Sequence, residues 1–246
     1  MRPHVIDLNE FYAGRLGHMA RRLIRRRVRE MWPDVSGFSM LALGYPTPYL
    51  RPFRDEAERL LVMMPARQGV VQWPADGPNQ VALADESDLP LPDASVDRVL
   101  LVHALEASEE MRPMLREVWR VMASGGRMLV VVPNRRGIWA RFERTPFGHG
   151  YPFTPPQLMR LLRENLFSPL QSKAALYAPP SDSRMVLRAA TAWEQLGARF
   201  GRTFAGVLVV EASKQVYAVT PSPVRRRRRR PRPVAVPEGA TALEKI

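Results

Sequence analysis

The sequence predicts an α/β fold in which helices cover both faces of a mainly parallel, seven-stranded sheet. Two observations support this prediction: short apolar runs alternate with segments of helical periodicity, and one run is continuous, as in a strand buried on both faces. A chain of 246 residues with 46% hydrophobic and 25% charged residues is also long and apolar enough to bury one sizeable core.

The first segment, residues 1–33, predicts a basic amphipathic helix. Between residues 7 and 31 apolar side chains recur at three- and four-residue steps, which places them on one face of a helix, and Trp32-Pro33 ends it. The opposite face is mostly arginine, since residues 20–30 hold six arginines and one glutamate.

The next segment, residues 34–220, predicts the α/β domain itself. Helical spacing predicts helices at 50–58 and 108–122, and the apolar runs predict strands at 38–43, 59–64, 79–84, 96–105 and 127–133. A further helix is expected after Thr154, an N-cap residue, with Pro155 in the first turn where its missing donor costs nothing.

The end of the chain predicts two different structures. The runs 205–214 and 214–219 predict an antiparallel strand pair at the edge of the sheet. Residues 221–246 are expected to form a disordered tail, because arginine and proline dominate there and few apolar residues remain to pack.

Composition argues against several classes of site. With no cysteine, the chain has no disulfide, zinc-thiolate site or thiol nucleophile, and its four scattered histidines lack metal-ligand spacing, so no metal is predicted. No run resembles a membrane span or the apolar core of a signal peptide, which predicts a cytoplasmic protein. No Gly-Lys-Ser/Thr follows a strand, which argues against P-loop and kinase function.

The net charge of +13 is concentrated at the two ends of the chain. Residues 225–233 alone hold seven arginines, and such runs attract phosphates and anionic lipid. Nonspecific contact with polyanions is therefore one prediction, and a simply solvated tail is the alternative. Sequence-specific recognition is not expected, since no aromatic or amide side chain interrupts the run.

Ligands of an open parallel sheet bind outside the carboxyl ends of its strands. The most informative such segment is 85–106, DESDLPLPDASVDRVLLVHALE, in which an acid after a strand is followed by Leu-Pro, a polar turn and a new strand. Together with the helix-Gly-Gly-strand order of 115–134 and the segment GYPFTPPQLMRLL at 150–162, it resembles the class I S-adenosylmethionine-dependent methyltransferases of the type 11 group. The resemblance covers roughly residues 38–217 and implies a Rossmann-like sheet and S-adenosylmethionine as cofactor.

The family's first glycine motif is degenerate in this chain. Of the pattern acid-x-Gly-x-Gly-x-Gly only Gly44 remains, because Ala42 replaces the acid and Pro46 and Pro48 replace the later glycines. A proline removes a backbone donor and fixes φ near about −65°, so this turn departs from the usual glycine loop. For a nicotinamide-dependent dehydrogenase the same turn would also need glycines, which disfavours that class.

The resemblance implies a cofactor site in which this chain keeps one of the family's three anchors. No acid lies between Arg59 and Ala75, where the family binds the ribose hydroxyls, and Gln68 is a weaker substitute. Losing that charge-assisted pair costs roughly 1.5 to 3 kcal/mol. Asp85 matches the acid that bonds the adenine amino group. The cofactor-binding residues expected from the resemblance are Gly44, Tyr45, Asp85, Glu86 and His103.

Each of these residues also has an ordinary structural interpretation. Gly44 suits any strand-to-helix turn, Asp85 suits a loop cap, and His103 suits a buried structural histidine. Catalytic residues stay unassigned: Glu106 stands where the family often has Leu-Glu-His, but Ala107 occupies the histidine position. Methyl transfer depends mainly on in-line positioning, so a missing acid-base pair does not exclude it.

Residues 133–152 predict a loop or lid over the site. Its aromatic residues are expected to pack the loop onto the sheet, whereas its polar residues are candidates for holding an anionic substrate, with a plain surface loop as the alternative. These substrate-binding candidates are Arg135, Arg136, His149 and Tyr151, together with Arg141 and Arg144. The N-terminal helix is expected to cover the site, as in the family, with membrane-surface or RNA binding as the alternative.

Two functions follow from these observations. The first is a methyltransferase acting on a small or lipid-like acceptor, in which the turn at 44–48 leaves an open cleft facing Asp85. The second is an inactive binding or regulatory protein of the same fold, in which Tyr45 or Met64 fills that cleft and the basic ends contact nucleic acid, membrane or a protein partner.

Overall fold

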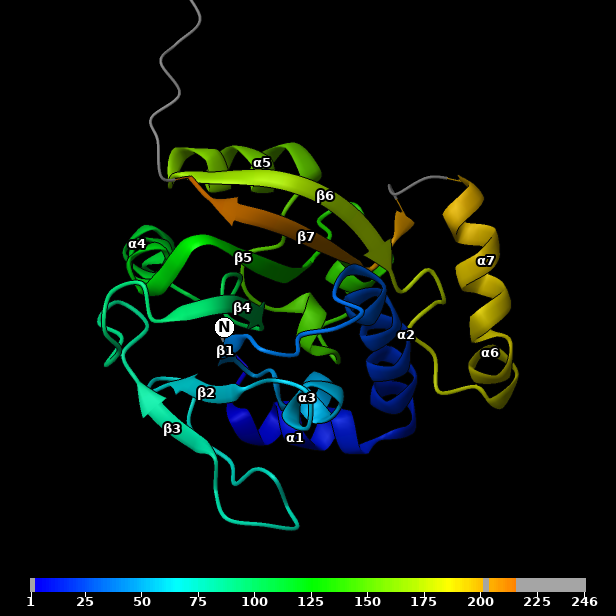
Figure 1. The fold of residues 1–246 in the computed structure, drawn as a ribbon. Helices are drawn as coiled ribbons and strands as arrows, with labels where there is room; N and C mark the ends of the chain where they lie inside the picture. Colours follow the sequence, from blue (N-terminus) through cyan, green and yellow to red (C-terminus); the bar gives the residue numbers. More distant parts are fainter. Residues whose placement is uncertain (1–2, 201–203, 216–246) are drawn as a thin grey trace, which may run out of the picture. The chain divides into compact units, whose positions relative to one another are not determined.

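The structure is a computed structural model that describes residues 3–200 and 204–215 (Figure 1). Its sheet has seven strands in the order β3-β2-β1-β4-β5-β7-β6. The first five pair in parallel, and β7 pairs antiparallel with both β5 and β6. The bounds are β1 Ser39–Gly44, β2 Arg59–Pro65, β3 Val81–Ala84, β4 Val96–Val102, β5 Met122–Pro133, β6 Phe167–Ala175 and β7 Val207–Lys214. The predicted seven-stranded, mainly parallel α/β class is thus confirmed.

Helices cover both faces of this sheet, because each strand buries alternate side chains on opposite sides. One face packs against α1, α2 and α3, and the other packs against α4 and α5 (Figure 1). The bounds are α1 Val5–Ala13, α2 Arg15–Met31, α3 Thr47–Arg54, α4 Met111–Val121, α5 Pro155–Glu164, α6 Arg184–Arg188 and α7 Ala190–Phe200, with short 3-10 turns η1 Ile138–Arg141 and η2 Pro146–Gly148.

The predicted N-terminal helix is two helices rather than one. Gly14 separates α1 from α2 with φ −75° and ψ 165°, an extended conformation that ends the first helix and begins the second. Directly afterwards Gly17 packs against the Phe11 carbonyl so closely that any side chain there would collide with it. The apolar periodicity continues through this bend, which is why the sequence indicated a single helix.

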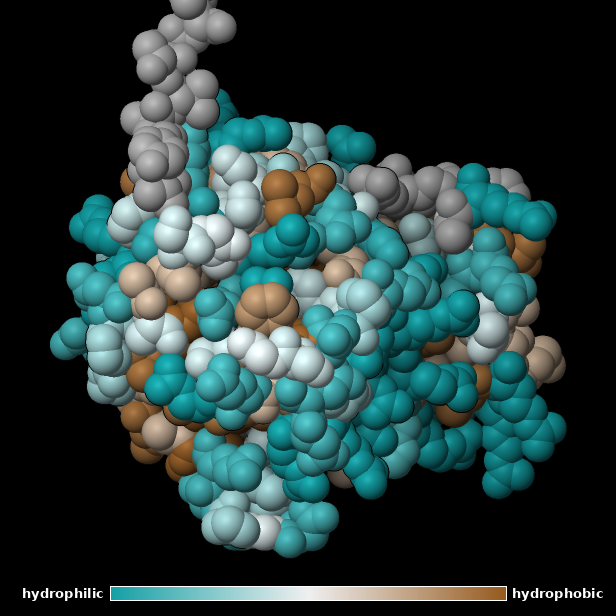
Figure 2. All heavy atoms as spheres, in the orientation of Figure 1, coloured by the Kyte–Doolittle hydropathy of each residue, from teal (hydrophilic) through white to brown (hydrophobic). Residues whose placement is uncertain are grey.

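The arginines of α2 are exposed or partly exposed. Figure 2 shows hydrophilic atoms over the region of α2. Arg26 and Arg27 pair with Glu30, and Arg29 pairs with Glu56. The inner side is buried against the sheet through the apolar residues Met19, Ala20, Leu23, Ile24, Val28 and Met31.

The antiparallel strand pair at the sheet edge exists, but its partners differ from those predicted. β7 pairs with β6 (Phe167–Ala175). Of the second strand predicted, 214–219, residues 216–219 lie outside the described part of the chain. The β6 segment FSPLQSKAA has no continuous apolar run because most of its middle is partly or fully exposed, so it gave no strand signal. The helices α6 and α7 were also not predicted.

The predicted disordered tail, 221–246, lies outside the described residues. Within the described residues, no helix combines the length and the apolar character needed to cross a membrane.

Candidate functional site

A cavity of about 150 Å³ lies at the carboxyl ends of β2 and β3, on the side of the sheet where β1 and β4 also end. Parallel strands bring these ends to one edge, and strand order reverses between β1 and β4, which is where such sheets bind ligands. The cavity is lined by Ala66, Arg67, Asp85, Glu86, Ser87, Glu109 and Glu110.

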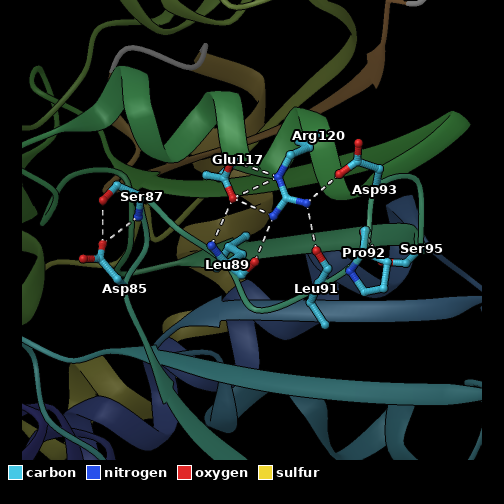
Figure 3. Close-up of polar contacts among 9 residues, drawn as sticks. All are labelled: Asp85, Ser87, Leu89, Leu91, Pro92, Asp93, Ser95, Glu117 and Arg120. Atoms are coloured by element: carbon cyan, nitrogen blue, oxygen red, sulfur yellow. Dashed lines mark hydrogen bonds and ion pairs between the residues drawn. The ribbon is translucent and has the colours of Figure 1, made fainter.

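Asp85 and Glu86 present two different carboxylates to this cavity. Asp85 is exposed, and its Oδ1 accepts hydrogen bonds from the Ser87 Oγ at 2.6 Å and backbone N at 2.8 Å (Figure 3). These bonds hold the pKa of the Asp85 carboxyl below its usual range, so it is charged at neutral pH. Glu86 is buried and accepts from the Ser108 hydroxyl at 3.4 Å.

Arg120 of α4 holds residues 89–93, the segment that directly follows the Asp85 turn (Figure 3). The Arg120 guanidinium donates to the carbonyls of Leu89 and Leu91, each at 2.8 Å. It also pairs with Glu117 and Asp93, while the Glu117 carboxylate accepts from the Leu89 N–H at 3.0 Å. Bonding to Arg120 lowers the pKa of the Glu117 carboxyl, so the network stays charged.

Gly44 ends β1 with φ +98°, a conformation that favours glycine. Its Cα faces the Val102 carbonyl of β4 so closely that a Cβ would collide with it. The next N–H, that of Tyr45, donates to the same Val102 carbonyl at 2.7 Å. The turn therefore packs against its neighbouring strand, and the Tyr45 donor is not available to a ligand.

Side chains fill the space beyond this turn. The Tyr12 hydroxyl of α1 shares hydrogen bonds of 2.8 Å with the Tyr49 hydroxyl and with His103 Nε2. His103 Nδ1 in turn lies 3.1 Å from Glu106 Oε1. All four side chains are buried, and the Tyr12 ring also stacks on Tyr45 with a centroid separation of 5.9 Å. The sequence grouped Tyr12 only with the apolar face of a helix, so its part in this cluster was missed.

S-Adenosylmethionine, the cofactor implied by the resemblance, fits one end of this site and not the other. At the adenine end, Asp85 and Glu86 line an open cavity. At the ribose position no acid is present, and the Gln68 amide donates to the His103 carbonyl at 3.2 Å while its Oε1 has no partner within the described part of the chain. The space lined by Gln68, Glu86 and Ala104 is only about 10 Å³. Beyond the Gly44 turn, where the resemblance places the methionine end of the cofactor, lie the stacked rings of Tyr12 and Tyr45.

The substrate candidates are not brought together. Two grooves of about 590 and 280 Å³ border the lid loop, and Phe11, Arg144 and Thr145 line both. His149 lines the smaller groove. Arg135, Arg136 and Tyr151 line neither groove and are exposed, and the Arg135 Nε donates to the Pro152 carbonyl.

The tyrosine cluster predicts a pH dependence of stability. Burial, and next the neighbouring Tyr49, raises the pKa of the Tyr12 phenol well above its usual value, and burial likewise raises that of Tyr49. Both phenols stay protonated in the folded state, whereas those of the unfolded chain ionise above about pH 10, so stability falls as pH rises past that point. In urea unfolding the double variant Tyr12→Phe/Tyr49→Phe should lose less stability between about pH 8 and pH 11 than the parent. Tyr151→Phe, at an exposed site, should behave as the parent; equal losses in all three proteins would contradict the prediction.

Comparison with known proteins finds a family match over part of the chain and solved structures of similar fold. Residues 50–130 match the family described as Methyltransferase domain, of type 11. A S-adenosylmethionine-dependent methyltransferase from Thermotoga maritima has a TM-score of 0.58 at 17% identity, covering 86% of this chain and 95% of that one. One from Mesorhizobium loti has a TM-score of 0.55 at 18% identity, covering 77% and 96%.

A third solved structure holds ligands. The 1,6-didemethyltoxoflavin-N1-methyltransferase of Burkholderia thailandensis, with bound 1,6-didemethyltoxoflavin and S-adenosylhomocysteine, has a TM-score of 0.51 at 16% identity, covering 78% of this chain and 76% of that one. No curated protein matches the chain in sequence. The chain thus has the fold of the class I S-adenosylmethionine-dependent methyltransferases, and its residues 50–130 match the type 11 methyltransferase domain family.

Proposed function

We propose that this protein is a S-adenosylmethionine-dependent methyltransferase that acts on a small or lipid-like acceptor. The family match and the fold support S-adenosylmethionine as the cofactor. The observation that carries the proposal is the cavity at the ends of β2 and β3, where the charged carboxylate of Asp85 and the buried Glu86 lie side by side. The cytoplasmic location expected from the sequence stays a prediction.

In this proposal the chain's own residues bind and position. Asp85 accepts a hydrogen bond from the adenine amino group, and Arg120 acts as a positioning residue because it fixes the segment that directly follows the Asp85 turn. The cofactor, when bound, supplies the methyl group of a sulfonium. The grooves beside Phe11 and Arg144 are proposed to hold the acceptor, because they border the lid over the same edge of the sheet.

A second candidate function is favoured by one observation, the filling of the methionine end by Tyr12 and Tyr45. In this candidate the fold serves as a scaffold whose basic surface binds nucleic acid, a membrane or a protein partner. Arg22 and Arg25 of α2 make no ion pair with any described residue, which leaves their charges available to a polyanion. The run at 225–233 lies outside the described residues.

Calorimetric titration with S-adenosylhomocysteine tests the proposal and separates the two candidates. If the protein is the enzyme, Asp85→Ala should weaken binding by about tenfold or more, the size expected when a charge-assisted hydrogen bond is lost. Asp88→Ala is the matched control, because Asp88 is exposed in the same turn but does not line the cavity. If the parent and Asp85→Ala bind S-adenosylhomocysteine with equal affinity, Asp85 does not contact the cofactor. Absence of binding at millimolar ligand by the parent and by a variant with the methionine end emptied would favour the second candidate.

A further inference from the structure

We propose that α1 is a self-inhibitory plug, which occupies the methionine end of the cofactor site through Tyr12 and must leave before the complete cofactor can bind. This inference rests on the proposed function and adds to it a closed state that the chain itself maintains. Four observations carry it: the buried face of α1, the bend at Gly14, the wall that α1 makes between two cavities, and the polar groups that Tyr12 covers.

The buried face of α1 is directed at the cofactor site. Only Val5, Leu8 and Tyr12 are buried along its nine residues, and they lie on one face of the helix. The Val5 N–H donates to the Gln68 carbonyl at 2.9 Å, at the ribose position of the site. The first turn of α1 thus borders the ribose position, and its last turn places Tyr12 in the methionine end.

The bend at Gly14 lets α1 move without α2. Gly14 is extended and joins the two helices as the C-cap of one and the N-cap of the other. α2 is held to the sheet by a longer stripe of buried apolar residues, including Leu23, Ile24 and Val28. Backbone rotation at this exposed glycine can swing α1 away. The close contact between Gly17 and Phe11 is then lost, while α2 keeps its own packing on the sheet.

Tyr12 and Phe11 lie between the adenine cavity and the two grooves that border the lid. On one side, Tyr12 contacts His103, and Ala104 after it lines the small space next to the adenine cavity. On the other side, Phe11 packs edge-on against Phe147 with a centroid separation of 6.0 Å and lines both grooves. Movement of α1 would join the adenine cavity to the grooves, as transfer from a cofactor to an acceptor requires.

Departure of Tyr12 also exposes groups that can hold a ligand. The Tyr49 hydroxyl and His103 Nε2 each lose their hydrogen bond to the Tyr12 hydroxyl. Both remain in the buried pocket, and Glu106 continues to orient His103 through Nδ1. A polar ligand end that replaces Tyr12 therefore meets two hydrogen-bonding side chains already in position.

Two probes separate the ends of the site. Adenosine reaches only the adenine and ribose positions, whereas S-adenosylhomocysteine also needs the space of Tyr12. In calorimetric titrations Tyr12→Ala should raise the affinity for S-adenosylhomocysteine by about 10- to 100-fold, because the fraction of open protein no longer limits binding, and change that for adenosine by less than about twofold.

A reversible lock gives the opposite test. The protein has no cysteine, so the pair Val5→Cys/Gly69→Cys is the only thiol pair in the chain. A Cβ on Gly69 would lie 2.9 Å from Val5 Cγ1, which is a distance that a disulfide can span. The oxidised variant should lose affinity for S-adenosylhomocysteine, and reduction should restore it. Gly69→Cys alone controls for the strain of a side chain at φ +92°.

The outcomes distinguish failure of the plug from failure of the proposed function. If S-adenosylhomocysteine binds equally well to the parent, Tyr12→Ala and the oxidised lock, the plug is wrong and the methyltransferase proposal stands. If adenosine binds every variant but S-adenosylhomocysteine binds none, including Tyr12→Ala, the plug is also wrong, since emptying that end did not admit the ligand. If neither probe binds any variant, the proposed cofactor site fails, and the plug with it.

Discussion

Replacing Trp139 with alanine is expected to lower the free energy of unfolding by about 3 to 5 kcal/mol, the usual cost of truncating a fully buried tryptophan. Trp139 has no exposed surface, and its Nε1 donates to the Ala178 carbonyl at 2.8 Å. Its ring packs edge-on against the Phe147 ring with a centroid separation of 5.5 Å. Gly206, just before β7, lies against the same indole ring. The substitution leaves a cavity and an unpaired carbonyl at the root of the lid.

Urea unfolding followed by circular dichroism measures this loss. Phe142→Ala is the matched control on the same loop, because Phe142 is 44% exposed and its removal should change stability by less than about 1 kcal/mol. Trp139→Phe should fall between the two, since it keeps most of the apolar volume and loses the hydrogen bond. A loss below about 1 kcal/mol for Trp139→Ala would show that the lid does not depend on this contact.

Arg120→Ala is expected to cost about 2 kcal/mol of stability and to weaken binding of S-adenosylhomocysteine by about tenfold. Two carbonyls, those of Leu89 and Leu91, lose their donor, and the Glu117 carboxylate loses its cation. The turn that follows Asp85 is then no longer fixed to α4. Arg120→Lys should recover little of the loss, because an ammonium cannot bond two carbonyls and two carboxylates in a planar arrangement.

The control for this prediction is Arg116→Ala, one turn earlier on α4. Arg116 is exposed and makes no ion pair with any described residue, so its removal should leave both stability and affinity near the parent values. Unfolding and titration of the same three variants separate the two effects. If Arg120→Ala loses stability but keeps its affinity, the turn is structural and does not position Asp85.

Much of the fold was predictable because its signals are local. The continuous apolar run at 127–133 and the helical spacing at 108–122 correspond to β5 and α4. Both signals follow from backbone geometry, which places every second residue of a strand, or every third to fourth residue of a helix, on the same face. β6 was not predicted because most of the middle of this edge strand is partly or fully exposed, so its sequence has no apolar run. Its pairing with β7 joins residues about forty positions apart.

The site divides in the same way. The sequence predicted a strand that ends at a turn with the acid Asp85. It also predicted an unusual first turn, because prolines stand at 46 and 48. The substrate candidates Arg135, Arg136 and Tyr151 were chosen from composition, and composition does not tell on which side of a loop a residue lies. Phe11 and Tyr12 carried no polar signal that would separate them from other apolar positions of an arginine-rich helix.

The sequence by itself thus determined the α/β class, the parallel order of its early strands and the altered glycine motif, because residue spacing and backbone chemistry act over a few neighbouring positions. Only the tertiary structure decided what fills the space beyond that motif. Tyr12 and His103 are 91 positions apart, and their hydrogen bond exists because the bend at Gly14 turns α1 back over the carboxyl edge of the sheet. Such a contact depends on the path of the whole chain, which no short repeat encodes.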